Sequence, residues 1–400
     1  MEQVTETVPV LFEKQPEPVP EQTREWKRTY SRAGLSVITL YGTVGVGQTI
    51  AAVLMMSVMA AWLMSRALPD FSAQALLNDP RIWLDDLQNT GILPLLIAIF
   101  LFVQGGFWIV GFVIMGIVLP KGTPIEKHNL SFGRFLLILL MCFGVWGVGA
   151  ALGNLSAFFG VETESLFSVE TLGKAMIPYL IYAVIGAPIV EELTFRKALL
   201  DRLHDTHEGY AAVISGLLFG LMHGNHMQFF LAFFLGMLFA MVYQRTGRII
   251  YTMLLHGIIN LTASLPEIFS LAGIDISGKW DGIVGALIVA GGILLIVKRR
   301  DPLLHAVLTT VFDANNAVYR NVGMRLVRIG ALVLIGGQGM LLIVFSMLAA
   351  DSWRWVFCLI DLIPLTLVFL TVFLLPIFTK RYEASAADLK PIDCGEDAGL

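Results

Sequence analysis

Charged residues are scarce in this chain. They make up only 14% of its 400 residues, whereas a soluble globular domain carries about 25%, so a water-facing surface over most of the chain is excluded. Cysteine is scarce as well: Cys142, Cys358 and Cys394 lie far apart, which excludes a disulfide framework and a cysteine-based metal site. No basic segment followed directly by an apolar one stands near the beginning of the sequence, so we expect no cleaved signal peptide.

Long apolar runs are what the sequence has in abundance. Hydrophobic residues account for 56% of the chain, and the mean hydropathy is +0.75. Most runs reach the roughly 20 residues that cross a bilayer. They fall at about 35–65, 92–119, 134–153, 174–192, 210–226, 227–244, 249–265, 282–297, 329–350 and 355–379. The predicted fold is therefore an all-α membrane helix bundle with about ten transmembrane helices.

The charges in the loops between these runs give an orientation. With the N-terminus in the cytoplasm, the inner loops carry Lys121, Lys127, Arg134, Arg196, Lys197, Arg202, Arg245, Arg248, Lys298, Arg299, Arg300, Lys380 and Arg381. The outer loops carry Asp70, Asp79, Asp85, Asp86, Glu162, Glu164, Glu170, Glu267, Asp275 and Asp281. This is the positive-inside pattern, so both termini are predicted to be cytoplasmic. We expect an integral protein of the plasma (inner) membrane of a bacterium.

The predicted organisation follows from these runs and from the segments between them. A disordered cytoplasmic tail is expected because the first residues are rich in Pro, Glu, Gln and Thr. A later stretch has apolar residues at helical spacing followed by arginines, which is typical of an amphipathic segment on the membrane surface. The segments are the tail at 1–30, N-terminal transmembrane helices at 31–169, a catalytic core at 170–265, the eighth span at 266–300, the amphipathic segment at 301–328, two C-terminal spans at 329–380 and a cytoplasmic tail at 381–400.

Ionisable groups inside membrane spans are costly and usually functional. Glu191 and Glu192 end one apolar run, and Arg196 follows Glu192 at i+4, on the same helical face. Glu191 and His223 stand at equal distances from a turn near residue 207, so they are predicted to lie at similar depth on neighbouring helices, as a general-base pair. Three further positions with polar or aromatic side chains in apolar runs are Phe219, His256 and Asn260.

His256 starts a His-x-x-x-Asn pair with Asn260, and both residues project from one helical face. Only about eight residues separate His256 from the start of its run, so it is predicted to lie shallower than the Glu191–His223 pair unless the helix ends differ in height. Asp361 in the last run is a further buried acid for which both a packing and a functional role stay open.

Three motifs stand in order in three runs: Glu-Glu-x-x-x-Arg at 191–196, Phe-x-x-x-His at 219–223 and His-x-x-x-Asn at 256–260. Together they resemble the CPBP family of intramembrane proteases, which groups type II CAAX prenyl endopeptidases with bacteriocin-processing and abortive-infection-like immunity proteins. The resemblance covers roughly residues 170–265.

By this resemblance, Glu191 and His223 would activate a water molecule, and His256 and Asn260 would stabilise the oxyanion. Glu192, Arg196 and Phe219 would support the site. The expected activity is hydrolysis of a peptide bond in a membrane-associated peptide or protein, with the lipid bilayer as surroundings and no nucleic-acid partner. No cofactor is expected, and a prenylated substrate is not indicated by any residue of the chain.

Several alternatives remain open at this level. Glu191, His223 and His256 could instead ligate a divalent metal such as zinc, although no His-Glu-x-x-His spacing is present. The same polar groups could serve only in helix packing, as a surface ion pair and interhelical hydrogen bonds. A secondary transporter or a non-catalytic membrane scaffold that retains the fold would also place polar groups at depth.

Overall fold

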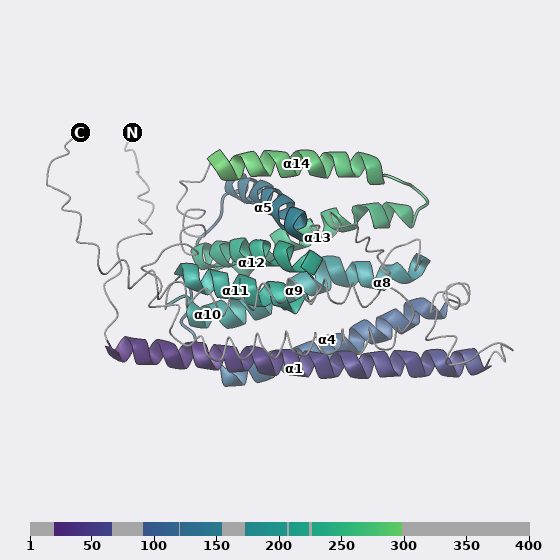
Figure 1. Ribbon diagram of the computed structural model, residues 1–400, viewed down its shortest axis with the longest axis horizontal. Coiled ribbons are helices and arrows are strands. Elements are labelled where there is room, and N and C mark those ends of the chain that lie inside the picture. The colour runs from purple at the N-terminus through teal and green to yellow at the C-terminus, as the bar shows by residue number, and fades with distance from the viewer. Residues whose placement is uncertain are drawn as a thin grey trace.

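The computed structural model describes residues 20–65, 91–119, 121–153, 173–205, 208–223 and 226–297. Every regular element in these ranges is helical (Figure 1). The long helices are α1 (Pro20–Ser65), α4 (Ile92–Val118), α5 (Phe132–Gly153), α11 (Glu208–Met222), α12 (His226–Thr246), α13 (Ile249–Ser270) and α14 (Ser277–Val297). The predicted amphipathic segment, the last two predicted spans and Asp361 lie outside the described residues.

Another span is built from short helical pieces that follow one another along the chain. After a 3-10 turn at Gly173–Ala175 it contains α8 (Met176–Ile181), α9 (Ala187–Glu192) and α10 (Leu199–Leu203). Two π-helical segments, Tyr182–Gly186 and Leu193–Ala198, join these pieces. Figure 1 shows α8, α9 and α10 in one row beside α11 and α12.

Within the described ranges, seven helices are long and apolar enough to cross a membrane. They coincide with seven of the apolar runs, so the all-helical membrane fold predicted from hydropathy is confirmed. The run at 210–226 is different, because α11 has 15 residues and a rise of about 22 Å, less than the roughly 30 Å of a bilayer core. The total of ten spans and the orientation remain predictions.

The first helix begins at Pro20, inside the segment predicted to be a disordered tail. Proline is favoured in the first turn of a helix, where its missing N–H costs nothing. The helix therefore begins at Pro20, ten residues before the end of the tail that composition predicts.

Helix α12 lies at the centre of the bundle. About 72% of its spanning window is buried, compared with 11% for α4 and for α14. Residues of α12 belong to two apolar cores, one shared with α1, α4, α10 and α11 and the other shared with α5, α13 and α14. Two apolar cores therefore share this helix, which explains why it is apolar nearly all round.

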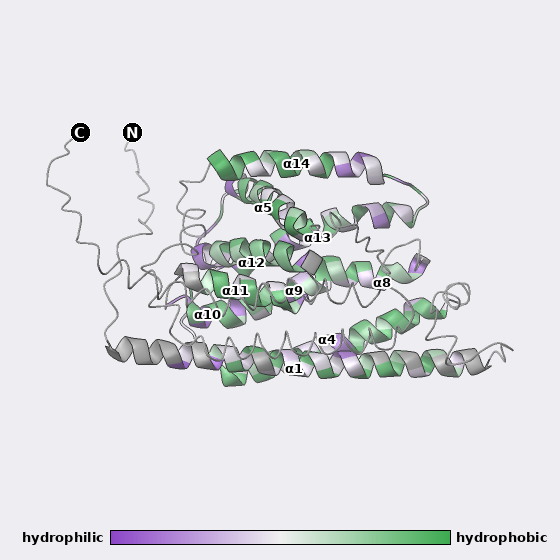
Figure 2. Ribbon diagram, viewed as in Figure 1, coloured by the Kyte–Doolittle hydropathy of each residue, from purple (hydrophilic) through white to green (hydrophobic). Residues whose placement is uncertain are grey.

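The outer helices present large apolar side chains. Phe102 on α4 is 82% exposed and Ile117 on the same helix is 77% exposed. Hydrophobic residues cover most of each helix, and hydrophilic ones gather mainly near the helix ends (Figure 2). Exposed apolar surface of this extent is typical of helices that face lipid.

Candidate active site

The site is organised by the irregular span that carries both carboxylates. Glu191 and Glu192 are the last residues of α9, which lies between the two π-helical segments. A π segment changes the register of the side chains that follow it, and such segments are frequent at functional sites. The helix α13 approaches this span closely, since a Cβ added to Gly257 would lie 3.3 Å from the carbonyl oxygen of Val184.

Glu192 and Arg196 form an ion pair that is fully buried. The Oε2 atom of Glu192 lies 3.0 Å from Nε of Arg196, and both side chains are 0% exposed. Arg196 Nη2 also donates a hydrogen bond of 3.2 Å to the carbonyl oxygen of Gly236 on α12. The guanidinium lies over the rings of Phe219 and Phe239, 4.6 and 5.5 Å from their centroids. The i+4 pairing predicted from the sequence is therefore present.

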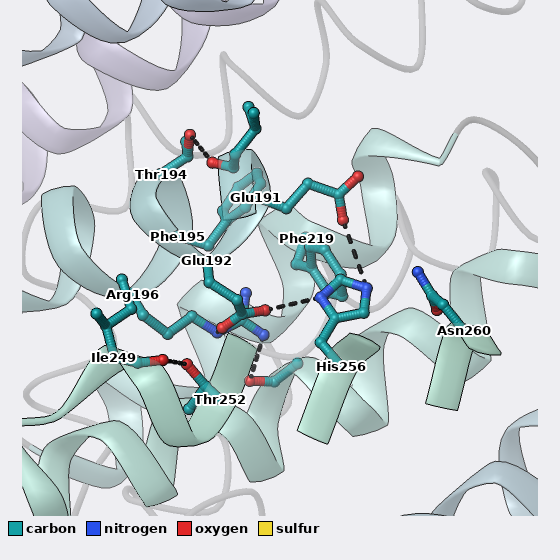
Figure 3. Close-up of polar contacts among 12 residues, drawn as sticks. Glu191, Glu192, Thr194, Phe195, Arg196, Phe219, Ile249, Thr252, His256 and Asn260 are labelled. Atoms are coloured by element: carbon teal, nitrogen blue, oxygen red, sulfur yellow. Dashed lines mark hydrogen bonds and ion pairs between the residues drawn. The ribbon is translucent and has the colours of Figure 1, made fainter. Parts of the chain in front are cut away.

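His256 on α13 faces both carboxylates. Its Nδ1 atom lies 3.0 Å from Oε1 of Glu192, at hydrogen-bond distance. Its Nε2 atom lies 3.8 Å from Oε2 of Glu191, close enough for an ionic interaction but too long for a direct hydrogen bond. Figure 3 shows the imidazole lying between the two glutamates. Because Glu192 is held in turn by Arg196, the orientation of the imidazole is fixed from one side.

This geometry differs from the depth predicted for His256. His256 lies against both carboxylates, at 3.0 Å from Glu192 and 3.8 Å from Glu191, so the shallower position predicted for it is wrong. Counting from a turn assumes regular helices with matched ends, and the span with two π segments is not regular.

The Phe219 ring connects the two histidines of the motifs. It makes edge-on contacts with the ring of His223, centroids 5.1 Å apart, and with the ring of His256, centroids 5.6 Å apart. His223 follows the end of α11, and its Nδ1 lies 3.0 Å from the carbonyl oxygen of Phe219. His223 is also within electrostatic range of Glu191. The structure thus gathers both histidines around one aromatic ring beside Glu191.

Asn260 lies one helical turn beyond His256 on α13 (Figure 3). Its Nδ2 donates a hydrogen bond of 2.8 Å to the carbonyl oxygen of Ala183, in the first π segment. An amide nitrogen carries two N–H groups, so one of them is engaged in this contact. Asn260 therefore ties α13 to the irregular span and keeps a second donor.

Sequence reasoning missed the residues that complete the surroundings of Arg196. Gly236 supplies a carbonyl acceptor, and a Cβ at this position would lie 2.8 Å from the Phe219 ring and 3.4 Å from the guanidinium. Phe239, three residues on, supplies a second aromatic face. A glycine in an apolar run is a weak sign of close approach, and nothing in the pattern identified what approaches it.

In the parts of the chain that the structure describes, no group of three or more His, Cys, Asp or Glu side chains is arranged to hold a metal ion. The expected alternative ligands Glu191, His223 and His256 are neighbours, but they do not form such a group.

Comparison with known proteins agrees with the motifs. Residues 173–262 match the family model described as type II CAAX prenyl endopeptidase Rce1-like. Over 146 residues the chain is 27% identical to the protein named "Putative membrane peptidase YdiL" of Bacillus subtilis (strain 168), a match that covers 35% of this chain and 60% of that protein's length. No solved structure matches the chain significantly. Both matches support the resemblance of residues 173–262 to the CPBP family, which the three motifs indicate.

Proposed function

We propose that the protein is a membrane-embedded endopeptidase in which Glu191 activates the water that attacks a peptide bond. The observation that carries this proposal is the row Arg196–Glu192–His256–Glu191, with separations of 3.0, 3.0 and 3.8 Å. Glu192 is held between Arg196 and His256, whereas Glu191 faces the imidazole of His256 at a distance too long for a hydrogen bond. A water molecule beside Oε2 of Glu191 and Nε2 of His256 can contact both atoms.

The proposed hydrolysis gives a role to each of four polar residues: Glu191, His223, His256 and Asn260. Glu191 takes a proton from the water as it attacks the carbonyl carbon, and the bound proton is later passed to the leaving amine. His256, oriented by Glu192, lies where it can share that proton, much as a third group orients the base in other hydrolases. The second N–H of Asn260 is a neutral donor for the oxyanion. His223, which stands against Phe219, is the second imidazole that can take part in the proton transfer.

The substrate class follows from the position of the site. Glu191 is 9% exposed and belongs to a span of 31 residues. A scissile bond must therefore be brought into the bundle, which suits an extended peptide or a protein tail attached to the membrane. We propose such a membrane-associated substrate, presented from the cytoplasmic face; a prenyl group on it is not required by any feature of the site.

The test compares membranes from cells that carry the wild-type protein or Glu191→Gln. Glutamine keeps the size of the side chain but cannot accept the proton, so an uncleaved precursor should accumulate only with the variant. Asp281→Asn, an exposed acid on α14, is the matched control and should behave as the wild type. Quantitative proteomics of membrane fractions gives the readout. Identical peptide profiles for Glu191→Gln and wild type, with equal protein amounts, would refute the proposal.

A further inference from the structure

The loop that joins α4 to α5 is fixed across the ends of other helices. Residues 121–131 have no regular structure, yet the backbone N–H of His128 donates to the carbonyl oxygen of Thr246 at 2.9 Å. The N–H of Leu130 donates to the hydroxyl of Tyr251 at 3.0 Å. These bonds hold the loop against the end of α12 and the beginning of α13.

Gly247 makes this close approach possible. It has a φ of 58°, in the left-handed region, and a Cβ at this position would lie 2.4 Å from the carbonyl oxygen of Glu126. Any larger residue would therefore push the loop away. Lys127 follows Glu126 directly, so its position relative to α13 is set by the same contact.

A partly open cavity of about 220 Å³ lies where Lys127 of this loop meets the end of α12 and the beginning of α13. Since one water occupies about 30 Å³ of liquid, the cavity has room for a small polar head group. It is lined by Lys127, Lys197, Tyr243, Gly247, Arg248, Ile249 and Ile250.

The lining carries more positive than negative charge. Lys197 Nζ lies 2.6 Å from Oδ2 of Asp201 and donates to the Tyr243 hydroxyl at 3.2 Å. That hydroxyl in turn donates to Oδ1 of Asp201 at 2.6 Å. Asp201 thus offsets Lys197 and holds it in place, while one of the three ammonium protons is left for another acceptor.

Lys127 and Arg248 have no such offset. Among the described residues neither forms an ion pair with an acid, and Nε of Arg248 is buried without a hydrogen-bond partner. A buried N–H of a cation that lacks an acceptor is costly. Two uncompensated cations therefore face one small cavity.

The cavity lies at a membrane boundary. It stands between the candidate spans Gln228–Thr246 and Ile249–Ser270, at the first turn of α13, where backbone N–H groups also favour an anion. Ile250 on its rim is 51% exposed and continues the apolar surface of α13. Cations and an exposed apolar side chain thus lie next to each other.

We propose that this cavity binds the phosphate group of an anionic phospholipid, whose acyl chains extend along the surface of α13 from Ile250. A phosphodiester supplies acceptors to Lys127, Lys197 and Arg248 at once. The apolar rim at Ile250 favours a lipid over a free anion as the ligand. Basic pockets between membrane helices are suited to anionic head groups. The proposal does not depend on peptidase activity.

The experiment measures lipid binding by the purified full chain in a neutral detergent. Phosphatidylglycerol or phosphatidylcholine of the same chain length is titrated, and bound lipids are counted by native mass spectrometry. Each basic residue near a lipid surface contributes about fivefold to binding, so the double variant Lys127→Gln/Arg248→Gln should bind phosphatidylglycerol about 30-fold more weakly. The single variant Lys127→Gln, at an exposed side chain, should lose about fivefold and guards against misfolding of the double variant.

The matched control is Arg134→Gln/Lys279→Gln, which removes two exposed cations that do not line the cavity. It should keep the wild-type preference for phosphatidylglycerol over phosphatidylcholine. Equal loss in both double variants would reduce the effect to net charge and overturn the proposal, as would an unchanged preference in Lys127→Gln/Arg248→Gln. Inorganic phosphate should displace the lipid only in large excess. Displacement at equal concentration would assign the cavity to free phosphate and overturn the lipid.

Discussion

Arg196 should matter more to stability than any other cation in the described part of the bundle. The substitution Arg196→Met keeps most of the side-chain length but leaves Glu192 buried without its cation. Removing one partner of a buried ion pair costs about 3–5 kcal/mol, and both side chains here are 0% exposed with a separation of 3.0 Å. The lost hydrogen bond to Gly236 adds about 1 kcal/mol. We expect a decrease of about 5 kcal/mol in the free energy of unfolding.

Lys197→Met is the matched control, because Lys197 and Asp201 form the next i,i+4 pair along the same span. The Lys197 side chain is 47% exposed, so solvent screens this pair and its loss should cost about 0–1 kcal/mol. Asp201 also retains the Tyr243 hydroxyl at 2.6 Å. The contrast between the two variants therefore compares a buried ion pair and its surrounding contacts with a solvent-screened pair in the same span.

The assay is reversible unfolding in mixed micelles of increasing dodecyl sulfate content, followed by helical circular dichroism. A double-mutant cycle with Glu192→Gln separates the pair from the general effect of each substitution, and a coupling of about 2–3 kcal/mol is expected. Two results would refute the reasoning. One is an equal decrease in Arg196→Met and Lys197→Met; the other is a coupling of zero, which would mean that Glu192 does not depend on Arg196.

Three further outcomes are expected. Asn260→Ala should lower turnover by about 100- to 1000-fold with little change in KM, because the lost donor acts on charge that develops in the transition state; wild-type turnover in a variant with wild-type thermal unfolding would contradict this. Peptidase activity of the purified protein should survive exhaustive chelation, and a loss restored by zinc alone would favour a metallopeptidase. Gly291→Val should destabilise the α5–α14 contact by about 1–3 kcal/mol, because a Cβ there would lie 2.2 Å from the Leu140 carbonyl oxygen. Gly292→Ala, with nothing within 4 Å of the added Cβ, is its control in thermal unfolding.

The helical membrane fold could be predicted from hydropathy because the bilayer imposes a length on every span. The run at 210–226 is the exception, because α11 has 15 residues, fewer than the roughly 20 that a full span needs. Hydropathy predicts which segments are apolar enough for a bilayer, but it does not predict the residue at which a helix ends.

The candidate site could be predicted in part. The Glu192–Arg196 pair depends only on positions four apart in one span, and this pair is present. The neighbours of His256 depend on how high one helix stands against another, which no spacing within either helix reveals. Two π segments interrupt the regular rise of the carboxylate span, and α13 begins separately at Ile249. Contacts within one span could therefore be predicted from the sequence, whereas contacts between spans could not.

The different surroundings of the two glutamates argue for different roles. Burying a carboxylate is expensive unless other groups compensate it. Glu192 is compensated by Arg196 at 3.0 Å and by His256 at 3.0 Å, which suits a group that holds others in place. Glu191 lies 3.8 Å from Nε2 of His256, beyond hydrogen-bond distance, and its side chain is slightly exposed, which suits a group that accepts a proton. The two glutamates are adjacent in sequence and have the same side chain. They differ because Glu192 lies four residues before Arg196, on the same helical face, whereas Glu191 does not.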